Sequence, residues 1–328
     1  MTTISYHHTV NDLQGLDWSG AGPFARLGWF AQLEESGHRP LVACARNRST
    51  AVALPLRKAK AGLESLTNWY AFTWSELRTH GISDNSLLEA LAEDLATHTH
   101  RITFTKLSAE DDTVDRLSQA FHHAGWLVMV EACDTNHILH VAGRSFRQFL
   151  ADRPGQLRTT LKRKATKVQV SISTQFDPGD WTAYEEIYAD SWKPEEGDSA
   201  MLRKFAMAES DAGRFRFAMA LHNGAPVAAQ FWTVDGDTAY IHKLAHRTSS
   251  RKLSPGTTLT AALFERVIDT DGVKHVDFGT GDDPYKRDWM EQTRVRWQLT
   301  CLRPASPLNW PHIARAELRK LVSRSNGG

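Results

Sequence analysis

The sequence has few cysteines and no long apolar run. Cys44, Cys133 and Cys301 lie far apart and form no C-x-x-C pair, which excludes a disulfide framework and a cysteine-rich zinc site and fits a reducing compartment. No apolar stretch approaches the roughly 20 residues that cross a bilayer, and the amino terminus lacks a basic-then-apolar segment. We therefore expect a soluble, cytoplasmic protein.

The chain also lacks an excess of charge of either sign. Its 39 basic and 38 acidic residues give a formal net charge of +1, so it exerts no overall attraction on nucleic acid, and we expect no nucleic-acid partner. Any anion site must come from a local patch. The 328 residues suit two domains of ordinary size.

Two halves of the sequence carry the same order of signals, β-β-β-α-β. In the first half, residues 40–46, 49–58 and 65–74 are predicted strands, followed by a helix over 86–96 and a strand over 101–107. In the second half, a hairpin over 214–234 turns at Asn223-Gly224. The next strand ends near His246, a helix covers 257–270 and a strand covers 273–280. We place a linker near Gly143–Gly155, which predicts domains over 1–145 and 146–328.

The turn between strand and helix in the second half is suited to an anion. Arg247, Arg251 and Lys252 precede the sequence Ser254-Pro255-Gly256-Thr257-Thr258, which opens the helix. Unpaired N–H groups and the positive end of the helix dipole meet there, as a phosphate requires. The corresponding turn of the first half, ELRTHGISDNS, has fewer cations and one glycine, so we assign the ligand to the second half.

These residues resemble the GNAT superfamily of acyl-CoA-dependent N-acyltransferases. The motifs that carry the resemblance are Ser254-Pro255-Gly256-Thr257-Thr258-Leu259 and Asp282-Asp283-Pro284-Tyr285-Lys286-Arg287-Asp288-Trp289. They are similar to the CelD/BioF2-like acetyltransferase domain, and the tandem arrangement resembles the FemAB-like branch. The resemblance covers residues 149–303. It implies an α/β (α+β) fold of two tandem GNAT-like domains, each a mixed, mostly antiparallel sheet flanked by helices, with a degenerate N-terminal domain and a catalytic C-terminal one.

The resemblance also implies a binding site for acetyl-CoA or a longer acyl-CoA as co-substrate. Leu244 and Ala245 would contact the pantetheine arm, and the CoA phosphates would lie near Arg247, Arg251 and Lys252. The residues that would face the pyrophosphate are Ser254, Gly256, Thr257 and Thr258. The usual GNAT turn is Gln/Arg-x-x-Gly-x-Gly/Ala, and Pro255 removes one N–H donor from it here. We expect the Thr257 and Thr258 hydroxyls to compensate.

Acyl transfer to an amine needs a base, donors for the oxyanion and an acid for the leaving thiolate. His242 is a candidate base because an imidazole titrates near neutrality, with a packed strand histidine as the alternative. Asp277, at the end of a strand, could bind or deprotonate the amine, or cap the turn that follows. Tyr285 is a candidate acid, and Lys286 a candidate for binding the oxyanion or an acceptor phosphate, with a surface ion cluster as its alternative.

Four further residues are candidates for binding the acceptor. Arg158 and Lys162 share one face of a basic helix that could hold an anionic acceptor or be simply solvated. Trp192 could line the acceptor cleft or pack in the core, and Asp282 follows the last strand. Asp282 and Asp283 lack His or Cys partners, which favours a solvated turn, so we expect no metal.

The acceptor itself stays open at this point, as an envelope sugar amine or a long-chain, sphingoid-type amine. A basic amphipathic segment over Ile313–Arg324 could contact the inner membrane peripherally or dock on the fold. One alternative is a FemAB-type aminoacyltransferase that uses aminoacyl-tRNA, although no heptad arm is present. A non-catalytic GNAT-fold binding protein is another. The sequence does not indicate an oligomeric state.

Overall fold

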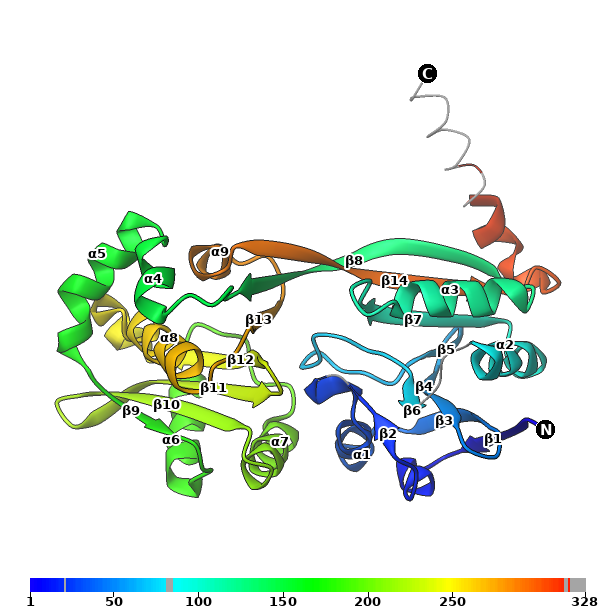
Figure 1. Cartoon of the computed structure of the whole chain (residues 1–328), viewed down its shortest axis with the longest axis horizontal. Coiled ribbons are helices and arrows are strands. Elements are labelled where there is room, and N and C mark those ends of the chain that lie inside the picture. The colour runs from blue at the N-terminus through cyan, green and yellow to red at the C-terminus, as the bar shows by residue number, and fades with distance from the viewer. Residues whose placement is uncertain (21, 81–84, 316–317, 319–328) are drawn as a thin grey trace. The chain divides into compact units, whose positions relative to one another are not determined.

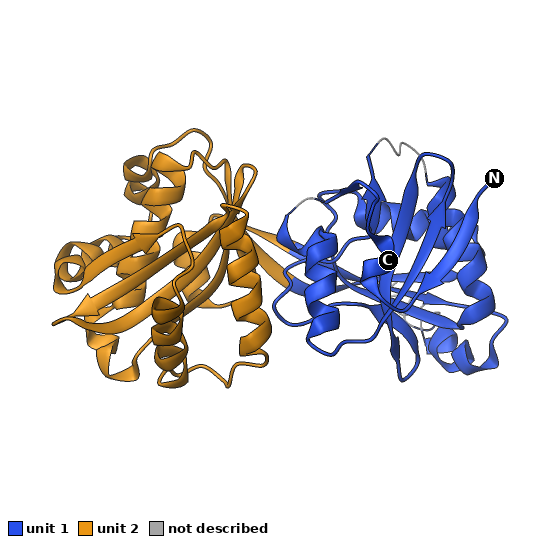
Figure 2. Ribbon diagram, turned by 90° about the horizontal axis from the view of Figure 1, so that it is seen from below, with its two compact units in different colours: residues 1–134, 295–328 blue, residues 135–294 orange. Residues whose placement is uncertain are grey.

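The computed structural model describes residues 1–20, 22–80, 85–315 and 318, and the chain divides into two compact units. Unit 1 comprises Met1–Asp134 together with the segment from Val295 onward, and unit 2 comprises Thr135–Arg294 (Figure 2). None of the helices in the described ranges combines the length and apolar character needed to span a membrane.

These units differ from the predicted domains 1–145 and 146–328. The chain leaves unit 1 within β8 (Leu127–His140) and returns to it within β14 (Gln292–Leu302). β14 takes a place between β7 and β8 in the unit 1 sheet, where Leu299, Cys301 and Leu302 are fully buried. The carboxy-terminal segment therefore completes the first unit, and the predicted linker contains a helix, α4 (Phe146–Ala151).

Unit 1 contains a mixed sheet in the order β1-β3-β4-β5-β7-β14-β8, with β6 paired to β4 and β2 to β6 (Figure 1). Helix α2 packs against α3 and β3. Its elements are β1 (Thr3–His7), η1 (Val10–Leu13), β2 (Trp18–Ser19), η2 (Pro23–Ala25), α1 (Leu27–Glu35), β3 (Pro40–Arg46), β4 (Ala51–Ala59), β5 (Gly62–Ser65), β6 (Leu77–Thr79), α2 (Ser86–His98), β7 (Arg101–Leu107), α3 (Thr113–His123) and η6 (Pro307–Asn309).

Unit 2 contains a sheet in the order β8-β13-β12-β11-β10-β9. Its elements after α4 are α5 (Gly155–Lys164), η3 (Ala165–Lys167), β9 (Gln169–Ser173), α6 (Pro178–Ala189), α7 (Ser199–Asp211), β10 (Phe215–His222), β11 (Ala225–Asp235), β12 (Thr238–His246), η4 (Thr248–Leu253), α8 (Pro255–Glu265), a π-helical turn (Arg266–Thr270), β13 (His275–Thr280) and α9 (Pro284–Trp289). The predicted turn at Asn223-Gly224 is confirmed, with φ of 53° and 80° as a two-residue hairpin requires.

The predicted β-β-β-α-β repeat is present in both units. β3, β4, β5, α2 and β7 form it in unit 1, and β10, β11, β12, α8 and β13 form it in unit 2. In each case the third strand pairs in parallel with the strand after the helix. The third strand of the first half is Gly62–Ser65, not the predicted 65–74, because Gly62 turns the chain directly back from β4.

Helices cover both faces of the unit 2 sheet. Adjacent residues of β11 show the two faces, because Trp232 packs against Phe264 of α8 while Phe231 packs against Trp181 of α6. Helices α4 and α5 contact α8 (Figure 1). The core between α8 and the sheet includes Trp289, which stacks on Phe264 at 5.0 Å between ring centroids.

Candidate active site

The central feature of unit 2 is the point where β12 and β13 part. The two strands pair in parallel only from Thr238↔His275 to Tyr240↔Asp277. On its other side β12 stays paired with β11 up to His246, with a bulge that leaves His242 as the extra residue. Within the described residues, the β13-facing edge of β12 from Ile241 to His246 therefore has no strand partner. An extended ligand could pair with such an edge, as in strand addition.

The amino terminus of α8 lies beside this open edge. Ser254 adopts the left-handed conformation, with φ of 51°, and Pro255 occupies the first helical position. Among the described residues, no acceptor bonds the N–H groups of Gly256 and Thr257. Two free amides and the helix dipole there favour an anion.

Gly256 allows α8 to approach β12 closely. A Cβ at this position would lie 3.4 Å from Leu244 Cδ1 and 3.8 Å from His246 Cδ2. These are ordinary contacts, so a side chain can start there without a clash, but it would extend toward β12. The predicted pantetheine residue Leu244 is thus next to the predicted pyrophosphate residue, while Ala245 is fully buried on the other face of the strand.

Of the three cations predicted near this turn, Arg247 faces another element, and the role of Arg251 and Lys252 stays a prediction. Arg247 turns toward α6, 3.7 Å from Glu186 and 3.6 Å from Asp190, and Arg251 and Lys252 are exposed. Lys164, at the end of α5, instead donates a hydrogen bond of 2.9 Å to Ser254 Oγ. Lys164 belongs to the basic run before β9. Because it lies 90 positions from Ser254, the sequence does not indicate that the two residues are in contact.

The two threonines differ in exposure. Thr257 is half-buried, whereas Thr258 is buried and its Oγ1 has no hydrogen-bond partner among the described residues. A ligand at the α8 amino terminus is one way to satisfy such a group.

His242 lies in an aromatic cluster. Its ring stacks on Phe231 at 5.0 Å and meets Phe205 edge-on at 5.1 Å, and its Nε2 is 2.8 Å from Thr233 Oγ1. Burial, with a smaller effect from Lys243, lowers the pKa of His242 to about 3. The imidazole is therefore neutral at pH 7 and a weak base. Its catalytic role stays a prediction, and its surroundings favour the packed-histidine alternative.

Asp277 is buried, and its carboxylate is fully engaged. It accepts hydrogen bonds from the Gly279 N–H at 2.7 Å, from Asn136 Nδ2 at 2.7 Å and from Arg294 at 2.8 Å. The bond to Gly279 is the turn cap that was the alternative to a catalytic role, and Asn136 and Arg294 were not foreseen. With three donors already bound, this carboxylate anchors the end of β13.

Tyr285 reaches back from α9 to the start of α8. Its hydroxyl is 2.8 Å from Thr260 Oγ1 and donates to the Gly256 carbonyl at 3.2 Å. Burial raises the pKa of Tyr285 to about 12. The phenol therefore stays protonated at neutral pH beside the free amides of the turn.

The remaining predicted residues make other contacts or are exposed. Lys286 donates to the Thr280 carbonyl, and Asp282 pairs with Arg287 and lies 3.4 Å from His137 Nε2. Trp192 is 59% exposed, with its ring 4.3 Å from that of His246, so it is no core residue. Arg158 and Lys162 are exposed on α5.

Sequence reasoning missed a charged cluster on the α6 face of β12. Lys243 Nζ is 2.9 Å from Glu196 Oε1, and these side chains are 7% and 11% exposed. Lys193 and Tyr188 complete the cluster. The sequence feature that could have indicated this cluster is Lys243 itself, a lysine at one of the alternate, buried positions of β12.

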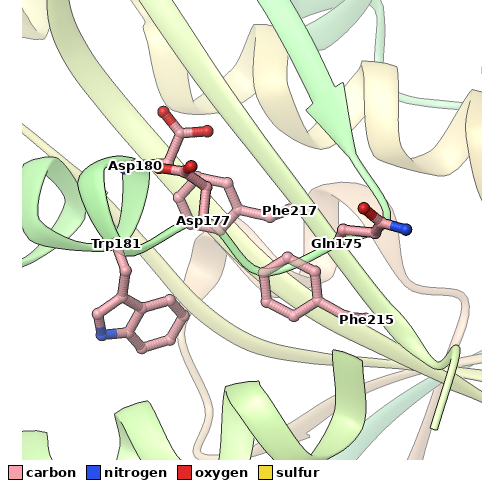
Figure 3. Close-up of a pocket in the computed structure, with 6 residues that line it drawn as sticks. All are labelled: Gln175, Asp177, Asp180, Trp181, Phe215 and Phe217. Carbon is pink, nitrogen blue, oxygen red and sulfur yellow. Dashed lines mark hydrogen bonds between the residues drawn. The ribbon is translucent and has the colours of Figure 1, made fainter. Parts of the chain in front are cut away.

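A small recess elsewhere in unit 2 does not belong to this site. It lies where α6 begins, and its lining residues are Gln175, Asp177, Asp180, Trp181, Phe215 and Phe217 (Figure 3). Asp177 caps the helix through the N–H groups of Gly179 and Asp180. The recess is accounted for by this cap.

Comparison with known proteins identifies the domain. Residues 151–287 match the family described as acetyltransferase (GNAT) domain. The structure is similar to FemX, with a TM-score of 0.64 at 10% identity over 94% of this chain and 99% of that one. It is also similar to a tandem GNAT protein from the clavulanic acid biosynthesis pathway, with a TM-score of 0.50 at 14% identity over 93% of this chain and 100% of that one.

The C-terminal domain of a putative lysylphosphatidylglycerol synthetase from Agrobacterium fabrum has a TM-score of 0.58 at 13% identity, over 84% of this chain and 87% of that one. Curated protein sequences give no significant match. The predicted fold class, two tandem GNAT-like domains with mostly antiparallel sheets and flanking helices, is confirmed.

Proposed function

We propose that this protein is an N-acyltransferase that moves an acyl group from a CoA thioester to a primary amine. The proposal starts from the match of residues 151–287 to the family described as acetyltransferase (GNAT) domain. The observation that carries the proposal is the open edge of β12 next to the free Gly256 and Thr257 amides. The strand edge suits an extended chain with amide groups, such as the pantetheine arm of CoA, and the two amides suit a phosphate. The pantetheine arm and the pyrophosphate are the two parts of CoA nearest its thiol.

The residues around the turn fit this donor. Gly256, Thr257 and the Lys164 ammonium lie together at the α8 amino terminus, and all three favour negative charge. We assign Lys164 to the role first predicted for Arg247, because the Arg247 guanidinium faces carboxylates of α6. Leu244 would border the pantetheine arm.

The reaction we propose is direct attack. The ammonium first releases one proton to solvent. The amine nitrogen then forms a bond to the thioester carbonyl carbon and the carbon–sulfur bond breaks, and the second proton lost by the nitrogen balances the one that the thiolate gains. We assign the donation of this last proton to Tyr285, because its phenol lies at the start of α8, at the Gly256 carbonyl. No Cys or Ser beside a His–acid pair was found in the sequence, so no covalent enzyme intermediate is proposed.

The experiment that tests this function is a thiol-release assay with acetyl-CoA and palmitoyl-CoA over a panel of sugar amines and long-chain amines. We expect amine-dependent release of CoA with at least one thioester. Palmitoyl-CoA turnover with long-chain amines would place the protein in lipid acylation and favour a peripheral location at the inner membrane. Sugar-amine turnover would favour envelope biosynthesis.

Two outcomes of this assay would support the alternatives. Binding of a thioester without turnover of any amine would indicate a GNAT-fold binding protein. Absence of thioester binding, combined with aminoacyl transfer from aminoacyl-tRNA, would indicate a FemAB-type enzyme. Of the solved structures compared above, FemX motivates the second check.

A further inference from the structure

Two lysines share one aromatic ring on the α6 face of β12. Lys243, on the strand, and Lys193, in the segment between α6 and α7, place their Nζ atoms 5.4 Å and 5.8 Å from the centre of the Tyr188 ring. Glu196, from the same segment, pairs with Lys243 at 2.9 Å. Two ammonium groups thus lie near the same ring, and the one carboxylate of the segment pairs with Lys243.

The charges of this cluster do not balance. Glu196 neutralises one lysine, while Lys193 contacts the rings of Tyr188 and Trp192. Over the described ranges, no carboxylate lies within ion-pair distance of the Lys193 ammonium. Burial, and next the charge of Lys243, lower the pKa of Lys193 to about 8. Holding a second positive charge there costs free energy that a bound anion would offset.

A third lysine approaches from the β13 side. Lys286, on α9 after β13, is close enough to Lys193 to act on its charge, as is Asp283. Lys286 is itself anchored to the Thr280 carbonyl and lies 5.5 Å from the centre of the Phe278 ring. The excess of positive charge therefore lies where β12 and β13 part.

The Lys243 side of this cluster is on the opposite face of the sheet from the anion position at α8. Gly256 of α8 lies beside Leu244 of β12. Lys243, the residue before Leu244, is paired with Phe231, whose side chain is on the α6 face. Neighbouring residues of a strand point to opposite faces. Lys243 is therefore on the other face of the sheet from Gly256. Lys193 lies at the edge between the two faces, because it contacts the Trp192 ring, which meets the His246 ring beside Gly256.

We propose that Lys193 and Lys243 recognise an anionic group, a carboxylate or a phosphate, carried by the amine acceptor. This inference rests on the proposed function, because it assigns the α8 side to the donor and the α6 side to the acceptor. It selects amino acids or phosphorylated amines over amines with no negative charge. Lys193 supplies the free charge, and Glu196 holds Lys243 in place.

The test measures binding without any thioester. The probes are O-phosphoethanolamine against ethanolamine and glycine against glycinamide, titrated by calorimetry into Gly256→Glu, in which the α8 anion position is blocked. We expect the anionic member of one pair to bind at least about 10-fold more tightly than its neutral counterpart. The pair that shows the difference tells phosphate from carboxylate.

Three variants in the same background identify the residue responsible. Lys193→Gln should abolish the difference within a pair, Lys193→Arg should keep most of it, and Lys274→Gln, an exposed lysine paired with Asp237, should leave it unchanged. Equal binding of both members of each pair, or an undiminished preference in Lys193→Gln, would overturn the proposal. Neither result bears on thioester binding, which tests the proposed function separately.

Discussion

At the scale of single residues, surroundings decide which of the predicted groups can do chemistry. The residue types at His242 and Asp277 suggested a base, but the sequence could not show that Phe231 and Phe205 enclose the imidazole or that three donors bind the carboxylate. Those partners come from distant positions, such as Asn136, 141 residues from Asp277. For Tyr285, by contrast, the family motif alone directed attention to a phenol that lies at the Gly256 carbonyl, and its role as an acid stays a prediction.

The buried imidazole predicts an acid-sensitive fold. The pKa of His242 is lowered from 6.5 to about 3, so below pH 6.5 the unfolded chain binds a proton that the folded protein does not, and stability falls as the pH falls toward 3. Between pH 7 and pH 5 this residue should account for a loss of about 2 kcal/mol in unfolding free energy.

Urea denaturation of wild type and His242→Gln at both pH values measures this loss. The variant should lose about 2 kcal/mol less than wild type between the two pH values. His80→Gln, at an exposed histidine, should behave as wild type. An equal pH dependence in His242→Gln and wild type would show that the imidazole is not desolvated.

At the scale of elements, the strand–turn–helix unit was predictable and its side-chain contacts were not. Local signals were sufficient for β12, α8 and β13, because alternation, Pro255 and Gly256 all agree on them. Which cation reaches the turn depends on how α5 and α6 pack on the sheet. Arg247, seven residues from Ser254, lies against α6, whereas Lys164 on α5 contacts Ser254.

The contrast between these two cations is testable. Lys164→Gln removes a positive charge from the α8 amino terminus and should weaken acetyl-CoA binding about 5-fold, or about 1 kcal/mol. Arg247→Gln should change that affinity less than about 2-fold and lower the unfolding free energy by about 1 kcal/mol or less.

Calorimetry at low and high salt checks both variants, because the Lys164 effect should shrink at high salt. If Arg247→Gln weakened binding more than Lys164→Gln did, the assignment of the phosphate cation would be reversed.

At the scale of the whole molecule, the repeat was predictable and the path of the chain was not. Periodicity identifies a β-β-β-α-β unit in each half, but it carries no information on which sheet a strand joins. β14 alternates weakly, with Arg296 buried and Val295 exposed, and only the paired register with β7 reveals its place. The predicted boundary near residue 145 therefore omitted an internal strand of unit 1.

This path predicts how fragments behave. A fragment of residues 1–145 lacks β14, which exposes apolar surface on β7 and leaves ladder groups unpaired, so it should show no cooperative thermal unfolding. Residues 1–134 joined to 295–328 by a flexible Gly/Ser linker should unfold cooperatively, as followed by circular dichroism. Cooperative unfolding of the 1–145 fragment would contradict the role given to β14.

The most direct test of the central claim is calorimetric titration of acetyl-CoA and palmitoyl-CoA into wild type, Gly256→Glu and the control Gly28→Glu, which lies in unit 1. We predict that wild type and Gly28→Glu bind at least one thioester and that Gly256→Glu binds it at least about 30-fold more weakly, about 2 kcal/mol, because a carboxylate would oppose the pyrophosphate. The thermal midpoint of Gly256→Glu is measured beside the affinity, because Gly256 is buried and only the Cβ of the new side chain makes ordinary contacts. Absence of thioester binding in wild type, or undiminished affinity in Gly256→Glu, would contradict the account.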